Sequence, residues 1–210
     1  MNNNVPSAES LPAKNPLLGQ ALGLCAAMTA TTSVVGGVSM GLAVALTLTL
    51  SNIVVSALRK FIPHQIRLVV FAVIIAGFAA AADMLLRAFW PAAAGTLSTL
   101  FPLTAVNCLV LGRAEAFASR NDVAASALDG VLHGAGYTLA LLLMSLFREV
   151  LGAGTIGAGL LGKAGEGIRV LPAAFTVNAM LLPVGGFLVL AVLIAAARWI
   201  FPGIAGQKEG

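Results

Sequence analysis

The chain has 210 residues, of which 59% are hydrophobic and only 10% are charged, and its mean hydropathy is +0.98. A soluble domain carries about 25% charged residues, so the composition excludes an ordinary soluble enzyme and predicts an integral membrane protein. The net charge of +4 does not indicate a nucleic-acid partner, because the basic residues stand singly at the ends of apolar segments. We therefore expect contact with membrane lipid and no nucleic acid.

Six apolar segments are each long enough to cross a bilayer, which predicts an all-α membrane protein with six transmembrane helices. They cover roughly residues 17–34, 40–58, 68–90, 97–116, 123–147 and 176–199. Turns are expected at 35–38, 60–65, 91–95 and 119–122, with a glycine-rich loop at 151–172. Residues 1–14 lack the pattern of a cleaved signal, so we expect a disordered cytoplasmic tail, one membrane domain at 15–200 and a second cytoplasmic tail at 201–210.

The distribution of basic residues predicts the orientation of the chain. With the N-terminus in the cytoplasm, eight basic residues lie on that side: Lys14, Arg59, Lys60, Arg67, Arg113, Arg120, Arg198 and Lys208. Four lie outside, namely Arg87, Arg148, Lys163 and Arg169. Because Lys and Arg are in excess in cytoplasmic loops, both termini are expected in the cytoplasm and the glycine-rich loop on the opposite side.

The spacing of corresponding features predicts an internal repeat. Three segments precede Pro91 and three follow it, so a duplication would give two inverted three-helix repeats, at about 15–90 and 97–200. Cys25 and Cys108 are 83 residues apart, and the same shift takes Met40, at the start of segment two, to Val123, at the start of segment five.

Segments one and four lack the pattern of continuous helices. Small and polar residues follow the cysteine in LGLCAAMTATTSVVGG, and Pro102 and Gly112 interrupt segment four. We expect both segments to be broken into half-helices, which are tolerated in a membrane only where protein surrounds them. The alternative is that Thr29, Thr31 and Thr32 bond back to their own helix.

The only two cysteines, Cys25 and Cys108, are the main candidates for a functional site. At a rise of about 1.5 Å per residue, each lies near the middle of a ~30 Å hydrocarbon layer, where two thiolates could hold a metal. A 2Fe-2S cluster needs four ligands, so this chain could supply only half of them. From the residues alone, inert buried thiols or a disulfide are open alternatives.

Ionisable residues within the segments are candidates for an ion path. Asp129 and His133 are four residues apart on one face of segment five, and Glu115 stands with Arg113 where segment four leaves the membrane. Each could equally belong to a hydrated or charge-paired helix end. No catalytic triad or nucleotide-binding loop is recognised, so no catalytic residue is assigned. Interhelical hydrogen bonds are expected from Asn52, Asn107 and Asn178.

Four stretches, NPLLGQALGLC, GLAVALTLTLSNIVVSALRKFIP, VNCLVLGRAEAFAS and FREVLGAGT, together resemble a known family. It comprises the integral membrane subunits of the Rnf and sodium-translocating NADH:quinone oxidoreductase complexes. The resemblance runs from Asn15 to about Trp199 and is closest to the E-type subunits of Rnf, with the D-type subunits of the sodium pump as the alternative branch. One departure is Ala26, where the family commonly has proline after the first cysteine.

The resemblance implies a translocase component of a bacterial inner membrane that relays electrons across the membrane within a ferredoxin:NAD oxidoreductase, coupled to Na⁺ or H⁺ movement, with no complete active site of its own. It implies a 2Fe-2S cluster bound by Cys25 and Cys108 together with two cysteines of a paralogous partner of opposite topology, the A-type subunit of Rnf. The other expected partners are the B-, C-, D- and G-type subunits of Rnf. The alternative from another class is a secondary transporter with incidental cysteines, and iron content would separate the two.

Overall fold

The computed structural model describes residues 23–59, 62–63, 65–89, 101–105, 107–156, 168–169 and 182–200. Its α-helices are α2 Leu24–Ala30, α3 Val34–Leu58, α4 Arg67–Phe89, α6 Phe101–Ala105, α7 Cys108–Arg113, α8 Val123–Gly152 and α9 Pro183–Ile200. A π-helical turn, η2 Ala114–Ala118, continues α7. Two short strands, β1 Thr155–Ile156 and β2 Ile168–Arg169, pair antiparallel within the glycine-rich loop, a detail that the all-α prediction missed.

Three of the described helices are long and apolar enough to cross a membrane. They are α3, the Arg67–Met84 part of α4, and α8, and the shorter Pro183–Ala196 part of α9 is also apolar. Predicted crossings two, three and five therefore correspond to helices of spanning length. Crossings one, four and six extend beyond the described residues, as do the predicted tails at 1–14 and 201–210.

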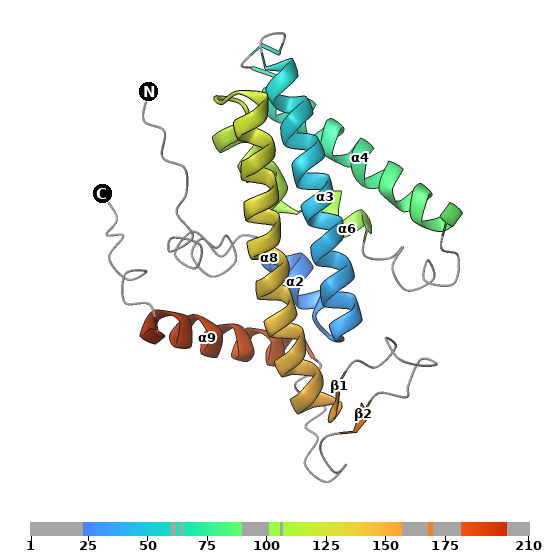
Figure 1. Cartoon of the computed structure of the whole chain (residues 1–210), viewed down its shortest axis with the longest axis vertical. Helices are drawn as coiled ribbons and strands as arrows, with labels where there is room; N and C mark the ends of the chain where they lie inside the picture. The colour runs from blue at the N-terminus through green and yellow to red at the C-terminus, as the bar shows by residue number, and fades with distance from the viewer. Residues whose placement is uncertain are drawn as a thin grey trace.

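The centre of the fold is an antiparallel pair formed by α3 and α8, which lie side by side along the longest axis of the molecule (Figure 1). Glycines on each helix lie against the other helix. A Cβ added at Gly41 would be 2.6 Å from Thr138, one at Gly130 would be 2.8 Å from Thr49, and one at Gly134 would be 2.7 Å from the α3 backbone. Lipid tails are as apolar as leucine, so membrane helices associate through close packing of this kind.

The predicted turn at 35–38 is wrong, because these residues belong to the first turns of α3. The chain turns instead at 31–33, where Ser33 Oγ accepts the Gly36 N–H at 3.1 Å and caps the helix. Gly37 serves close packing, since a Cβ there would be 2.7 Å from the hydroxyl oxygen of Ser145. The pair Gly36 and Gly37, which predicted a turn, thus lies inside α3, and Gly37 makes a close contact with α8.

The predicted break in segment four is present. α6 ends at Ala105, and α7 begins at Cys108 after Asn107, whose Oδ1 accepts the Leu109 N–H at 3.0 Å. Pro102 is the second residue of α6, where a missing N–H costs little, and Gly112 lies inside α7. The break therefore comes at the capping asparagine rather than at the proline or the glycine.

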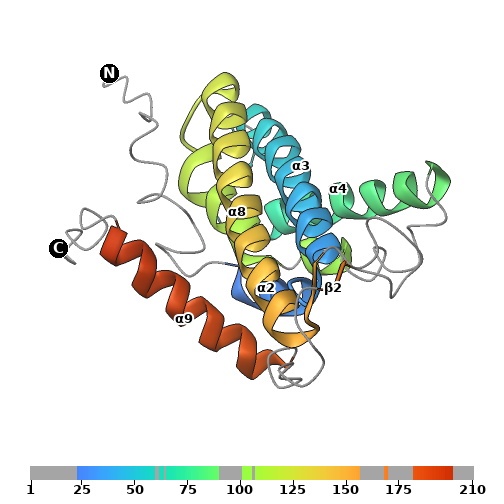
Figure 2. The same ribbon diagram turned by 60° about the horizontal axis from the view of Figure 1, so that its bottom comes forward.

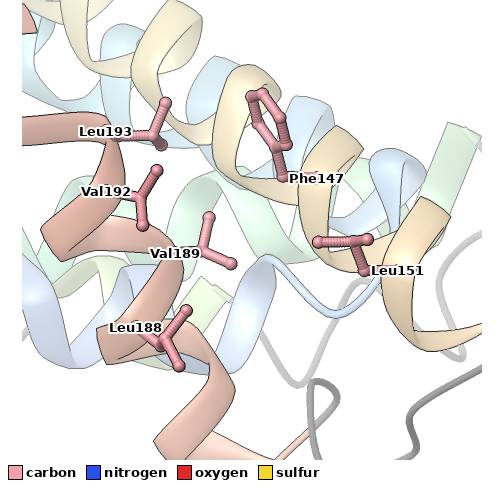
Figure 3. Close-up of a pocket in the computed structure, with 6 residues that line it drawn as sticks. All are labelled: Phe147, Leu151, Leu188, Val189, Val192 and Leu193. Atoms are coloured by element: carbon pink, nitrogen blue, oxygen red, sulfur yellow. The ribbon is translucent and has the colours of Figure 1, made fainter. Parts of the chain in front are cut away.

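The helices α4 and α9 leave opposite ends of the central pair and project outward in both views (Figures 1 and 2). Both expose large apolar side chains, among them Val69, Val73 and Met84 on α4 and Val184, Phe187 and Val192 on α9. A shallow groove between α8 and α9 (Figure 3) is lined by Phe147, Leu151, Leu188, Val189, Val192 and Leu193. The exposed apolar side chains and the six residues that line the groove suit lipid tails or apolar helices.

The close contact of α3 with α8 predicts that Gly134→Ala destabilises the protein. The new Cβ would lie 2.7 Å from the Ala45 Cα, an overlap that costs about 1–3 kcal/mol when a packed core must adjust. The matched control is Gly77→Ala on α4, where a Cβ meets nothing within 4 Å and alanine favours the helix by roughly 0.5–1 kcal/mol. Thermal unfolding in detergent should show a lower Tm for the first variant only. Equal Tm values would contradict the packing described here.

Candidate metal centre

Cys25 and Cys108 occupy corresponding places in two short helices. Cys25 is the second residue of α2 and follows the N-cap Gly23 by two positions, whereas Cys108 is the first residue of α7 and directly follows the N-cap Asn107. Both cysteines are free thiols and both are exposed. This arrangement does not fit a disulfide between them or a buried position for either thiol.

One hydrogen bond joins the starts of the two helices. The Gly23 N–H donates to Cys108 Sγ with an N···S distance of 2.9 Å, although the two residues are 85 positions apart in the sequence. Gly23 has a φ of 80°, in the left-handed region that favours glycine. This bond brings the N-terminus of α2 against Cys108, the first residue of α7. The first half of segment one, before Gly23, lies outside the described residues.

Tyr137 on α8 also contacts both helix starts. Its side chain is fully buried, its O–H donates to the Gly23 carbonyl at 3.1 Å, and its oxygen accepts from Asn107 Nδ2 at 3.5 Å. No sequence pattern singled out Tyr137, although it is the single tyrosine of the chain and stands in a long apolar segment.

The C-terminal end of α2 is held by Arg148, which is fully buried. Its Nη1 donates to the Met28 carbonyl at 2.9 Å and to Thr31 Oγ1 at 2.7 Å, and its Nη2 donates to the Leu182 carbonyl at 3.2 Å. The sequence predicts that Arg148 follows segment five as an outside charge, whereas here it is a buried residue of the helix α8. α8 continues five residues past Phe147, so Arg148 lies within the helix and satisfies carbonyls that the end of α2 leaves without helical partners.

The neighbouring Glu149 holds the start of α3. Its Oε2 accepts the Val34 N–H at 2.6 Å, and the side chain is almost fully buried. A carboxylate is favourable at the positive end of a helix, and an arginine is favourable at the negative end. The adjacent pair Arg148 and Glu149 therefore fixes both sides of the turn between α2 and α3. The motif FREVLGAGT contained this pair, but the sequence alone did not show its role.

The ion-path candidates are paired with arginines. Asp129, which is 8% exposed, accepts hydrogen bonds from Nε and Nη2 of Arg113, and its Oδ1 lies 3.1 Å from His133 Nδ1. Glu115 pairs with Arg67 of α4. The structure thus brings Asp129 and His133 together as predicted and places Glu115 in a separate ion pair. The alternative of charge-paired helix ends fits these contacts.

The asparagines and threonines behave as structural groups. Asn52 Nδ2 donates to the Ser126 carbonyl across the α3–α8 contact at 3.4 Å, and Asn107 contacts Tyr137, so the predicted interhelical hydrogen bonds are confirmed for these two. Thr29 and Thr31 bond back to carbonyls of α2, as the alternative for segment one held. Asn178 lies outside the described residues.

The donor set fits half of an iron-sulfur site. Iron in a 2Fe-2S cluster is normally bound by four cysteine thiolates, and the two cysteines here are free, exposed and joined through Gly23. Within the described part of the chain, no group of three or more His, Cys, Asp or Glu side chains is placed to hold a metal ion. Ala26 lies in the first turn of α2, where N–H groups have no intrahelical acceptor, so alanine and the proline common in the family fit the helix equally well.

These features define an integral membrane protein in which two interrupted segments present a pair of cysteines at the surface. The family described as "Rnf-Nqr subunit, membrane protein" matches residues 7–194, and the chain belongs to this family. The resemblance seen in the sequence is thereby confirmed.

Similar proteins carry consistent names. The E component of a Na⁺-translocating ferredoxin:NAD⁺ oxidoreductase complex from Acetobacterium woodii is 44% identical over 187 residues, covering 89% of this chain and 91% of that protein. The E component of an ion-translocating oxidoreductase complex from Rhodobacter capsulatus is 44% identical over 192 residues, covering 89% and 79%. Its counterpart from Vibrio cholerae is 37% identical over 201 residues, covering 92% and 86%.

The buried contacts of Arg148 predict that Arg148→Met lowers the stability of the protein. Methionine keeps the apolar stem but leaves buried acceptors without a donor, at about 1–3 kcal/mol for each. For a chain of this size the Tm should fall by about 5 °C or more. The matched control is Arg59→Met, because Arg59 pairs with Asp122, whose side chain is 87% exposed, and such pairs contribute about 0–1 kcal/mol. A similar small loss for both variants would contradict the role given to Arg148.

Proposed function

We propose that the protein is the E-type component of an Rnf complex, a translocase of a bacterial inner membrane that transfers electrons between ferredoxin and NAD and moves Na⁺ or H⁺. Relatives that align over most of both chains bear the name of such a complex. One observation carries the proposal: the only two cysteines are free and exposed at the starts of two short helices that are hydrogen-bonded to each other.

Cys25 and Cys108 would supply two of the four thiolates of a 2Fe-2S cluster, and the paralogous A-type subunit of Rnf, with opposite topology, would supply the other two. The exposure of both thiols leaves them accessible to such a partner. When bound, the cluster would accept and release one electron near the middle of the membrane. The part of this chain is to present two sulfurs at a fixed separation, through the contacts of Gly23, Asn107 and Tyr137.

An inverted repeat is supported by reciprocal contacts between α3 and α8. The N-cap residues Ser33 and Asp122 are 89 positions apart. The same shift relates Gly41 to Gly130 and Thr49 to Thr138, and Gly41 packs against Thr138 while Gly130 packs against Thr49. Contacts that exchange in this way are expected on a pseudo-twofold axis. The shift exceeds the 83 positions between the cysteines because the π-helical turn η2 and the turn after it lengthen the second repeat.

We place both termini in the cytoplasm, because that arrangement puts eight basic residues on the cytoplasmic side and four on the other.

Asp129 and its partners are the candidates for coupling electrons to ions, with His133 and Glu115 as further members. The six-residue helix α7 leads from Cys108 to Arg113, a distance of about 8 Å along its axis. Negative charge gained at the cysteine pair would attract the Arg113 guanidinium and weaken its hold on Asp129. The released carboxylate could then accept a cation, so that ion occupancy follows the redox state.

The incomplete ligand set predicts that the chain purified alone carries no stable cluster. Co-expression with the A-type subunit should give a complex that contains iron and shows the electron paramagnetic resonance (EPR) spectrum of a reduced 2Fe-2S cluster. Co-expression of the same partner with a chain that carries both Cys25→Ser and Cys108→Ser is the control and should give no iron. Stoichiometric 2Fe-2S in this chain as a monomer, with only its own cysteines as ligands, would contradict the shared site.

We also expect Cys25→Ser and Cys108→Ser to abolish electron transfer singly, because serine is similar in size but removes the thiolate that bonds iron. Asp129→Asn should change turnover or ion coupling less completely, since the amide retains its place beside Arg113. Ferredoxin-dependent NAD reduction and iron content in membranes would measure both effects. A serine variant that assembles normally and keeps full activity and iron would exclude the cluster mechanism for this chain.

A further inference from the structure

The position of Gly23 leaves space for no side chain. A Cβ there would lie 2.9 Å from Asn107 Oδ1 and 3.0 Å from both the ring and the hydroxyl of Tyr137, and the φ of 80° is strained for other residues. The backbone of Gly23 is thus enclosed by these two side chains. Its N–H donates to Cys108 Sγ at 2.9 Å, and this sulfur is one of the two presented to the partner.

A single hydroxyl connects the N-caps of both cysteine helices. Tyr137 donates to the Gly23 carbonyl, which belongs to the N-cap of α2, and accepts from Asn107 Nδ2, which belongs to the N-cap of α7. The Oδ1 of the same asparagine accepts the Leu109 N–H of α7. Tyr137 is 0% exposed and stands on α8, the helix that also packs against α3. A fully buried phenol with its partners satisfied is a rigid attachment point.

We propose that Tyr137 is a positioning residue for the electron relay: it sets the separation of Cys25 and Cys108 and keeps the Gly23 N–H on Cys108 Sγ, which raises the reduction potential at this pair. The inference rests on the proposed function. An N–H donor to a ligand sulfur stabilises the more negatively charged, reduced state, and hydrogen bonds of this kind are one of the means by which proteins set cluster potentials. Tyr137 touches no metal in this role and acts through Gly23 and Asn107.

The test compares Tyr137→Phe with Thr138→Val in the complex co-expressed with the A-type subunit. Phenylalanine removes only the connecting hydroxyl. Thr138 is the next residue of α8, and its hydroxyl donates only to the Gly134 carbonyl of its own helix. Tyr137→Phe should keep its iron but show a midpoint potential shifted to more negative values and an altered EPR spectrum, whereas Thr138→Val should behave as the wild type. A Tyr137→Phe complex with full iron, unchanged potential and unchanged spectrum would overturn the proposal.

A second measurement needs no metal. Dibromobimane, whose two arms react with thiols, is used to link Cys25 to Cys108 in the full chain in membranes, and the expected linking rate depends on the separation of the two sulfurs. Tyr137→Phe should lower this rate roughly fivefold, the factor expected for the loss of one hydrogen bond, while single-arm labelling with monobromobimane stays the same. An unchanged linking rate would contradict the positioning role even for a variant that fails to assemble. If the wild-type complex contained no iron, the proposed function would fail, but the linking rates would still decide the role of Tyr137.

Discussion

A helix that breaks inside a membrane leaves backbone groups without water, and in this protein the side chains of α8 satisfy them. Arg148 bonds the end of α2 and Glu149 bonds the start of α3. Tyr137 adds a second hydrogen bond to the Gly23 carbonyl, which also accepts the Ala27 N–H. Without Arg148 and Glu149, each buried backbone group that they bond would cost about 1–3 kcal/mol, which would destabilise the turn between α2 and α3. The placement of the cysteines therefore depends on one helix.

The helix α8, in the second half of the chain, packs against α3, in the first half, so the positions of both cysteines depend on this contact. Glycines let the two backbones approach closely, so the pair behaves as one rigid unit. Cys25 is fixed to this unit through Gly23 and Tyr137, and Cys108 leads through α7 to the Arg113–Asp129 ion pair on α8. In the proposed coupling, a change of charge at the cysteines would alter the electrostatic potential at Asp129 without a large movement of helices.

Much of this arrangement could be predicted from the sequence, because hydropathy reports which residues leave water. Segments two, three and five and the break in segment four follow from apolar length and residue spacing. The role of Cys25 and Cys108 as cluster ligands comes from the family resemblance and stays a prediction. The sequence could not show whether Gly36 and Gly37 make a turn or a helix contact, since glycine permits both and only the position of Ser145 decides. The sequence also could not show that Arg148 is a buried residue rather than a charge in a loop. Its hydrogen-bond acceptors are the carbonyls of Met28 and Leu182, which are 120 and 34 residues away in the chain.

The central claim is that Cys25 and Cys108 hold iron together with a second protein chain. Anomalous diffraction at the iron edge, measured from crystals of the assembled pair, tests it most directly. The account predicts an iron peak at the boundary between the two chains, within bonding distance of Sγ of both cysteines. An assembled pair with the fold described here, and with no iron peak at these sulfurs, would contradict it.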